Sequence, residues 1–197
     1  MKIVVVVDMQ KDFVDGALGT PEAQAIVPVV IERLKELDSS ENLIFFTKDT
    51  HYENYLDTQE GKNLPVPHCI EGTPGWSICK PISSFVDYDS HFCTYSSREI
   101  CKSRVLKSTF GSLDLAKIVQ NIVHNDNVNN SVDEIILMGV CTDICVISNA
   151  MLLKAYCPEI KITVDATCCA GVTPESHKAA LMTMKMCQIN IIGEEQG

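Results

Sequence analysis

The chain has 197 residues, long enough for a single domain whose core needs no disulfide to stabilise it. Its 26 acidic and 16 basic residues give a net charge of −10, which repels phosphate backbones and argues against nucleic acid as a partner. The ten cysteines contain no Cys-x-x-Cys pair, so we expect free thiols in a reducing, cytoplasmic compartment rather than disulfides or a zinc ribbon.

The N-terminal third predicts two buried strands around a helix. Residues 2–8 form a run of β-branched side chains that ends on Asp8, which is typical of a buried strand. This run is too short for a signal-peptide core or a membrane span, so we expect no membrane attachment. Pro28 suits the first turn of a helix that continues to about residue 38. Residues 42–47 then predict a second strand, which closes on Lys48 and Asp49.

Residues 50–85 hold four prolines and little periodicity, which indicates a long functional loop. Beyond this loop, apolar runs alternate with helical patterns. The elements expected there are a strand ending at Lys107, a helix carrying Leu115 to Ile122, a loop over 125–131, a strand over 134–140, a helix from 146, a strand over 161–165, a helix from Thr173-Pro174-Glu175 to about 186, and a strand over 188–192. This alternation predicts one α/β domain over 1–197, a three-layer αβα sandwich with a mainly parallel, Rossmann-like sheet.

Polar side chains stand at the expected carboxyl ends of the strands, where open α/β sheets place their sites. They are Asp8, Asp49, Lys107, the turn at 141–145 and Asp165. An acid, a cation and a thiol from separate strands would make a catalytic cluster. The alternative is that each residue only ends its strand in water.

The turn at 139–146 joins a buried strand to a helix and carries two cysteines. Thr142 is expected to be the N-cap, which places Cys145 in the first helical turn, near unpaired N–H groups. The positive end of the helix would favour the thiolate there, and the N–H groups could face an oxyanion. The alternative is two buried structural thiols one turn apart.

Several short motifs, in order, resemble those of the nicotinamidase/isochorismatase-like cysteine hydrolases. They are Asp-Met-Gln-Lys-Asp-Phe at 8–13, Lys-Asp-Thr-His at 48–51, Pro-His-Cys at 67–69, Gly-Thr-Pro-Gly at 72–75, Lys-Ser-Thr-Phe at 107–110 and Gly-Val-Cys-Thr-Asp-Ile-Cys-Val at 139–146. The resemblance implies an isochorismatase-like hydrolase fold and a triad of Asp8, Lys107 and Cys145. It also implies a cis peptide at Val140–Cys141, and we assign the oxyanion hole to the N–H groups of Cys141 and Cys145.

A metal site is also expected. Asp49 and His51 take alternate positions at a strand end, His68 comes from the proline-rich loop, and such ligands suit Zn²⁺, Fe²⁺ or Mn²⁺. In nicotinamidase-like proteins this metal binds the pyridine nitrogen of the substrate. Some of them have a third histidine between the other two, but this interval holds none here, so we expect Glu60 as the fourth ligand, directly or through water.

The resemblance implies an amidase that acts on a small primary amide, most specifically nicotinamide in pyridine nucleotide salvage, and that forms a homo-oligomer. Many such enzymes stack the pyridine on a tryptophan just before the Pro-x-His segment, a position with no aromatic here. We expect Phe13 to cover the ring, with Tyr55 or Trp76 as alternatives. Competing hypotheses are an amidase for carbamoyl or ureido compounds, an isochorismatase-type hydrolase, and a catalytically silent metal-binding protein.

Overall fold

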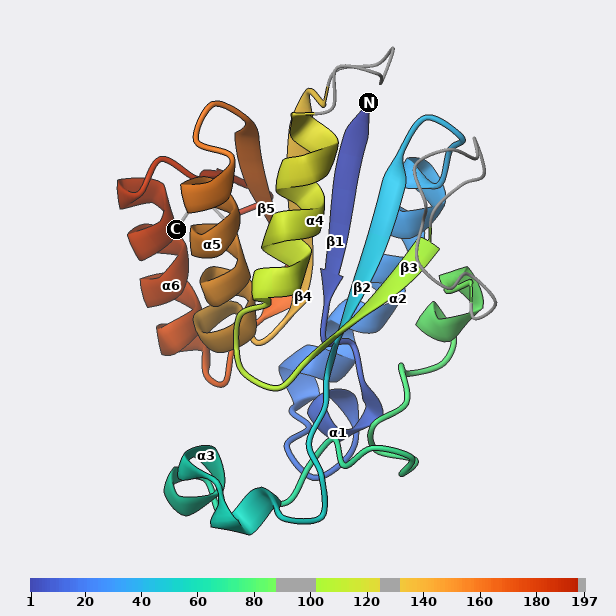
Figure 1. Ribbon diagram of the computed structural model, residues 1–197, viewed down its shortest axis with the longest axis vertical. Coiled ribbons are helices and arrows are strands. Elements are labelled where there is room, and N and C mark those ends of the chain that lie inside the picture. The colour runs from blue at the N-terminus through green and yellow to red at the C-terminus, as the bar shows by residue number, and fades with distance from the viewer. Residues whose placement is uncertain (88–101, 125–131, 195–197) are drawn as a thin grey trace.

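A six-stranded parallel sheet forms the centre of the protein (Figure 1). The computed structural model describes residues 1–87, 102–124 and 132–194. The strands, in the spatial order β3-β2-β1-β4-β5-β6, are β1 (Lys2–Val7), β2 (Leu43–Asp49), β3 (Lys102–Lys107), β4 (Glu134–Val140), β5 (Lys161–Ala170) and β6 (Asn190–Ile192). The direction in which successive strands are added to the sheet reverses at β1, so β1 lies between β2 and β4. The loops that follow these three parallel strands therefore lie together at the carboxyl edge of the sheet.

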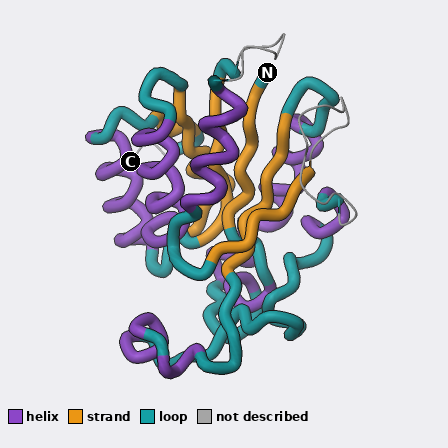
Figure 2. Tube along the Cα trace, viewed as in Figure 1, coloured by secondary structure: helices purple, strands orange, loops and turns teal. Residues whose placement is uncertain are grey.

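Helices cover both faces of the sheet (Figures 1 and 2). The helices α1 (Lys11–Val14) and α2 (Pro21–Leu37) lie on one face, and α4 (Leu113–Val123), α5 (Ile147–Tyr156) and α6 (Pro174–Met186) lie on the other. Alternate residues of β1 separate the two cores. Ile3 and Val5 pack with the second group of helices, whereas Val4 and Val6 pack with α1 and α2. The three-layer αβα prediction is therefore confirmed.

The predicted start of the helix between the first two strands is wrong. Helix α2 begins at Pro21, where the side chain of Thr20 accepts a hydrogen bond from the N–H of Ala23, and Pro28 lies inside it. An interior proline costs about 3 kcal/mol. A long apolar face offsets that cost, and its buried residues are Ala23, Ile26, Val30, Leu34 and Leu37.

Strand β5 also differs from the prediction, because it continues to Ala170 instead of ending at Asp165. Apolar and small residues follow Asp165, and they keep the strand paired with β4. Asp165 consequently lies within the sheet, where its Oδ2 meets Nε of Arg33 on α2 at 3.1 Å. It does not join the polar residues at the carboxyl edge.

The long segment after β2 is mainly irregular, as predicted. It contains short 3₁₀ turns at Tyr55–Asp57 and Ile82–Phe85 and the helix α3 (Gln59–Asn63). Figure 1 shows α3 beyond the carboxyl edge of the sheet, away from the main layers. The loop expected over 125–131 lies outside the described residues. None of the helices in the described ranges has the length and apolarity needed to cross a bilayer.

Candidate active site

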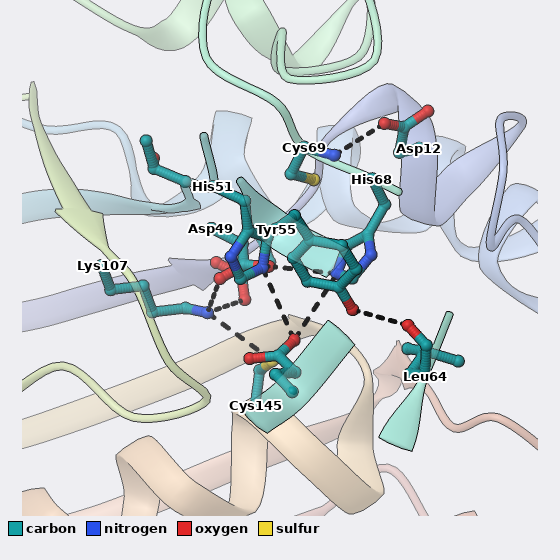
Figure 3. A network of polar contacts seen from close by, with 12 residues as sticks. Asp12, Asp49, His51, Tyr55, Leu64, His68, Cys69, Lys107 and Cys145 are labelled. Atoms are coloured by element: carbon teal, nitrogen blue, oxygen red, sulfur yellow. Dashed lines mark hydrogen bonds and ion pairs between the residues drawn. The ribbon is translucent and has the colours of Figure 1, made fainter. Parts of the chain in front are cut away.

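Side chains from four neighbouring strand ends meet at the carboxyl edge of the sheet, and Figure 3 shows three of them. Asp8 follows β1, Asp49 and Lys107 end β2 and β3, and Cys145 lies in the turn after β4. Asp8 has a φ of +48°, a conformation that costs most residues about 1–3 kcal/mol. This conformation turns the chain away from the sheet at the point where the carboxylate is needed.

Lys107 is the centre of this cluster. Its Nζ lies 2.6 Å from Oδ2 of Asp8, 3.2 Å from Oδ1 of Asp49 and 3.7 Å from Sγ of Cys145. Only 1% of the side chain is exposed. Burial alone would lower the pKa of Lys107, but the charges of Asp8, Cys145 and Asp49 raise it above its usual range. The lysine is therefore a fixed positive charge between two carboxylates and a thiol.

Asp8 is completely buried, and a second group orients it. The hydroxyl of Thr47, on β2, donates to Oδ1 of Asp8 at 2.7 Å and accepts the Asp8 N–H at 3.1 Å. Burial raises the pKa of Asp8, and the charge of Lys107 offsets part of that rise. A carboxylate whose pKa is raised in this way can both take up and return a proton. Thr47 was not predicted from the sequence, because nothing in an apolar strand marks one threonine as the partner of a distant carboxylate.

The turn that carries Cys145 begins with the expected cis peptide between Val140 and Cys141. It continues as a π-helical turn over Thr142–Val146, and only then does α5 start. The predicted capping role of Thr142 is wrong, because Cys141 holds the N-cap position and the Thr142 hydroxyl lies 2.8 Å from Nδ1 of His177. The hydroxyl of Thr142 is therefore engaged with His177, near the start of α6, instead of capping the turn.

Asn149, on α5, stabilises the same turn through hydrogen bonds. Its fully buried amide donates to the carbonyl groups of Cys145 at 2.8 Å and Phe110 at 3.2 Å, and it accepts the N–H of Ser112 at 3.0 Å. These contacts tie the segment after Lys107 to the backbone of Cys145. Asn149 was not predicted from the sequence, although a polar side chain within the apolar face of a helix is a signal for such a role.

The environment of Cys145 favours the thiol in the resting protein. Burial raises the pKa of Cys145 well above its usual range, the charge of Asp8 raises it further, and Lys107 opposes this. Burial and the charge of Asp8 thus act against the thiolate form that the positive end of the helix would favour. Burial also raises the pKa of Cys141, to about 12. For Cys145 to act as a nucleophile, its proton would have to pass to a base, and Asp8 is the carboxylate beside it.

A second group of side chains adjoins the cluster and has the composition of a metal site. One atom from each of Asp49, His51, Glu60 and His68 lies within 4.8 Å of the other three. Oδ2 of Asp49 is 2.9 Å from Nε2 of His51 and 3.5 Å from Nε2 of His68. Oε1 of Glu60, from α3, is 3.5 Å and 3.8 Å from the same nitrogens. Figure 3 shows Asp49, His51 and His68 of this group lying close together.

The chemistry of these donors fits a divalent cation. Nδ1 of His68 faces the carbonyl oxygen of Val66 at 2.8 Å, so this nitrogen carries a proton and Nε2 can offer a lone pair. Although burial favours the protonated form, the neighbouring His51, His68 and Lys107 hold the pKa of Asp49 well below its usual range, so it offers a carboxylate. Two carboxylates and two imidazoles suit Zn²⁺, Fe²⁺ or Mn²⁺. Asp49 links the two groups, since its other oxygen contacts Lys107.

The three predicted aromatic residues have different surroundings. The buried ring of Tyr55 lies 4.7 Å from that of His51 and 5.0 Å from that of His68, and its hydroxyl donates to the carbonyl of Leu64. Phe13 meets His68 edge-on at 5.4 Å. Trp76 has other contacts: Nζ of Lys48 lies 3.0 Å above its ring, and its indole N–H donates to Thr50. The structure brings Phe13 and Tyr55 to the metal-binding group and leaves Trp76 outside it.

Comparisons with known proteins find nicotinamidases and pyrazinamidases among the proteins similar to this chain. Nicotinamidase/pyrazinamidase of Mycobacterium tuberculosis is 23% identical over 196 residues, covering 98% of both chains. The nicotinamidase of Schizosaccharomyces pombe is 24% identical, covering 98% of this chain and 93% of its own length. The structure of Pyrococcus horikoshii pyrazinamidase in complex with zinc is 27% identical with a TM-score of 0.72, covering 97% of this chain and 98% of that one.

The family comparison covers almost the whole chain. The family described as the isochorismatase domain matches residues 2–196. The structure of Streptococcus mutans pyrazinamidase/nicotinamidase, 27% identical, has a TM-score of 0.75 and covers 98% of this chain and all of that one. The protein belongs to the isochorismatase family, and its relatives support its assignment as a hydrolase of carbon–nitrogen bonds.

Proposed function

We propose that the protein is a cysteine amidohydrolase for a small primary amide, with nicotinamide as the favoured substrate and nicotinate and ammonia as products. The observation that carries this proposal is the buried contact of Lys107 with Asp8 and Cys145, beside the metal-binding group. A thiol, an acid/base and a fixed cation in reach of one another are the parts that amide cleavage through a thioester needs. Nicotinamidase relatives and a zinc-bound pyrazinamidase structure support the choice of substrate.

The chemistry follows from the places of the three side chains. Asp8 accepts the proton of the Cys145 thiol as the sulfur attacks the amide carbonyl and a carbon–sulfur bond forms. The N–H groups of Cys141 and Cys145 are the proposed donors to the oxyanion. Protonated Asp8 then gives its proton to the leaving nitrogen, and ammonia departs. Asp8 next takes a proton from water, the resulting hydroxide opens the thioester, and Cys145 regains a proton from Asp8.

Lys107 stabilises the negative charge that moves between Asp8 and Cys145 during these steps, because its ammonium contacts both. Asp49, His51, Glu60 and His68 would hold a divalent cation, with Zn²⁺, Fe²⁺ and Mn²⁺ as the candidates. When bound, this ion would supply a Lewis acid for a ring nitrogen of the substrate. Phe13 and Tyr55 both lie against His68 and would limit which substrate rings fit beside the metal-binding group.

Nicotinamide hydrolysis tests the substrate directly. The purified protein is expected to release ammonia and nicotinate from nicotinamide in equal amounts, measured by a coupled ammonia assay and by chromatography. Pyrazinamide, benzamide and a set of carbamoyl and ureido compounds form the comparison. Benzamide lacks the ring nitrogen and should react more slowly. Preference for a ureido compound over every ring amide would replace nicotinamide with the alternative amidase function, and no turnover of any compound would favour the silent metal-binding protein.

Loss of one histidine is expected to remove the metal. The variant His68→Ala deletes a ligand nitrogen from a group of four and should reduce the bound divalent ion from about one per chain to well under half, as measured by elemental analysis after gentle purification. His124→Ala is a matched control, because His124 is exposed at the end of α4. Full metal content in His68→Ala would exclude His68 as an essential ligand.

The homo-oligomer and the cytoplasmic location stay predictions from the sequence. Light scattering of the purified protein tests the first of them.

A further inference from the structure

Gln10 is a buried side chain for which the proposed reaction gives no role. Its amide nitrogen donates to the carbonyl of Asp49 at 2.8 Å and to the carbonyl of Trp76 at 3.0 Å. Its amide oxygen accepts the N–H of Asp49 at 2.7 Å. One side chain thus satisfies both backbone groups of Asp49, with no exposed surface of its own.

The strand register explains why Asp49 needs this partner. Strands β1 and β2 pair up to Val6 and Phe46, so continued pairing would bring residue 9 opposite Asp49. The chain instead turns away at Asp8, and β1 ends at Val7. On its other side Asp49 is still paired with Lys107 of β3. The amide of Gln10 has the same donor and acceptor as a peptide group, and it takes the place that the departing strand leaves.

The contacts of Gln10 extend beyond Asp49. Its second carbonyl partner belongs to Trp76. The indole N–H of Trp76 donates to Thr50, the residue between Asp49 and His51. Two residues beyond Gln10, the carboxylate of Asp12 accepts the N–H of Cys69 at 2.8 Å, directly after His68. The segment that supplies Asp8 therefore also holds the backbone on both sides of the metal-binding group.

We propose that Gln10 is a positioning residue for the metal-binding group. By fixing the backbone of Asp49, its amide keeps Oδ2 directed at His51 and His68 while Oδ1 stays on Lys107. This inference rests on the metal-binding part of the proposed function. Groups that orient metal ligands in this way commonly change metal affinity by about 10- to 100-fold when they are replaced.

The variant Gln10→Glu tests the role most sharply, because it keeps the shape of the side chain and replaces its amide nitrogen with oxygen. The carbonyl oxygens of Asp49 and Trp76, at 2.8 and 3.0 Å, would then face an acceptor instead of a donor. The backbone of Asp49 would have to move, and its carboxylate with it. Gln10→Met removes the same hydrogen bonds without adding charge and serves as the second variant, should the first fail to fold.

Asn149→Asp is the matched control. Asn149 is also a fully buried amide with three hydrogen bonds, but it holds the Cys145 turn and contacts none of the four metal-binding residues. Zinc affinity is measured for each full-length protein by competition with a chromophoric chelator, and thermal unfolding of the metal-free proteins is followed alongside. We expect Gln10→Glu to bind Zn²⁺ about 10- to 100-fold more weakly than the parent, and Asn149→Asp to stay within about twofold.

Three results would overturn the inference: equal zinc affinity in Gln10→Glu and the parent, an equal loss in the Gln10 and Asn149 variants, or a parent protein that binds no divalent ion. Ammonia release from nicotinamide, measured on the same preparations, separates these results from a failure of the proposed amidase. A parent that binds zinc but releases no ammonia leaves the role of Gln10 standing and removes the amidase.

Discussion

Replacing Cys145 with alanine is expected to abolish amide hydrolysis while the protein stays folded. The thiol is the nucleophile of the proposed reaction, and loss of a nucleophile that works with a fixed acid/base typically lowers kcat by about 10⁴- to 10⁶-fold. Cys145 is buried in a packed turn, and alanine leaves out only the sulfur. Initial rates of ammonia release, with thermal unfolding as the check on the fold, give the measurement.

Cys141→Ala is the control for this experiment, because it removes a thiol from the same turn and keeps the backbone N–H that we assign to the oxyanion hole. It should retain a substantial part of the activity. The opposite pattern, with Cys145→Ala active and Cys141→Ala inactive, would show that Cys141 is the nucleophile. Alkylation of the parent by iodoacetamide, located by mass spectrometry, gives an independent test, since nicotinamide should protect Cys145.

Lys107→Met is expected to cost the protein more stability than any exposed lysine substitution. It leaves the carboxylates of Asp8 and Asp49 buried without the ammonium that contacts both. Removing one partner of a buried ion pair typically costs about 3–5 kcal/mol. Urea unfolding of the metal-free protein measures this loss. Lys35→Met, at an exposed ion pair with Glu32 on α2, should change the free energy of unfolding by less than about 1 kcal/mol.

A double variant separates loss of charge from loss of packing. Adding Asp8→Asn to Lys107→Met removes one of the two uncompensated carboxylates, so part of the lost free energy of unfolding should return. A double variant that is as unstable as the sum of the two single variants would show that charge is not the cause. The single variants Lys107→Met and Asp8→Asn and the double variant should all be inactive, because each lacks a group that the proposed proton transfers need.

The fold was largely predictable because its signals are local. Strands β1 and β4 are continuous apolar runs, and the start of α6 at Thr173 and Pro174 shows in the sequence as a cap followed by a proline. The same order occurs at Thr20 and Pro21, but the prediction gave more weight to Pro28, which the long apolar face of α2 tolerates. The position of Asp165 was also predicted wrongly, because its ion pair with the partly exposed Arg33 lets a charged residue lie within a strand.

The site was predictable only in part. The rule that parallel strands end at one edge brings Asp8, Asp49 and Lys107 together without knowledge of any contact. The residues that orient them were missed, because their partners are far away in the chain. Gln10 binds the backbone of Asp49 and Asn149 binds that of Phe110, each 39 residues away. Apolar periodicity carries no information about such side-chain to backbone hydrogen bonds.

Lys107, at the centre of the proposed catalytic cluster, comes from β3, an edge strand of the described sheet. In the described sheet, β3 pairs only with β2, whereas β1, which leads to Asp8, lies between two strands. The free energy of local opening is lower for edge strands than for strands in the interior of a sheet. Such an opening would carry Lys107 away from Asp8 and Asp49 together, so local fraying of one strand would interrupt the proposed reaction while the core stayed intact.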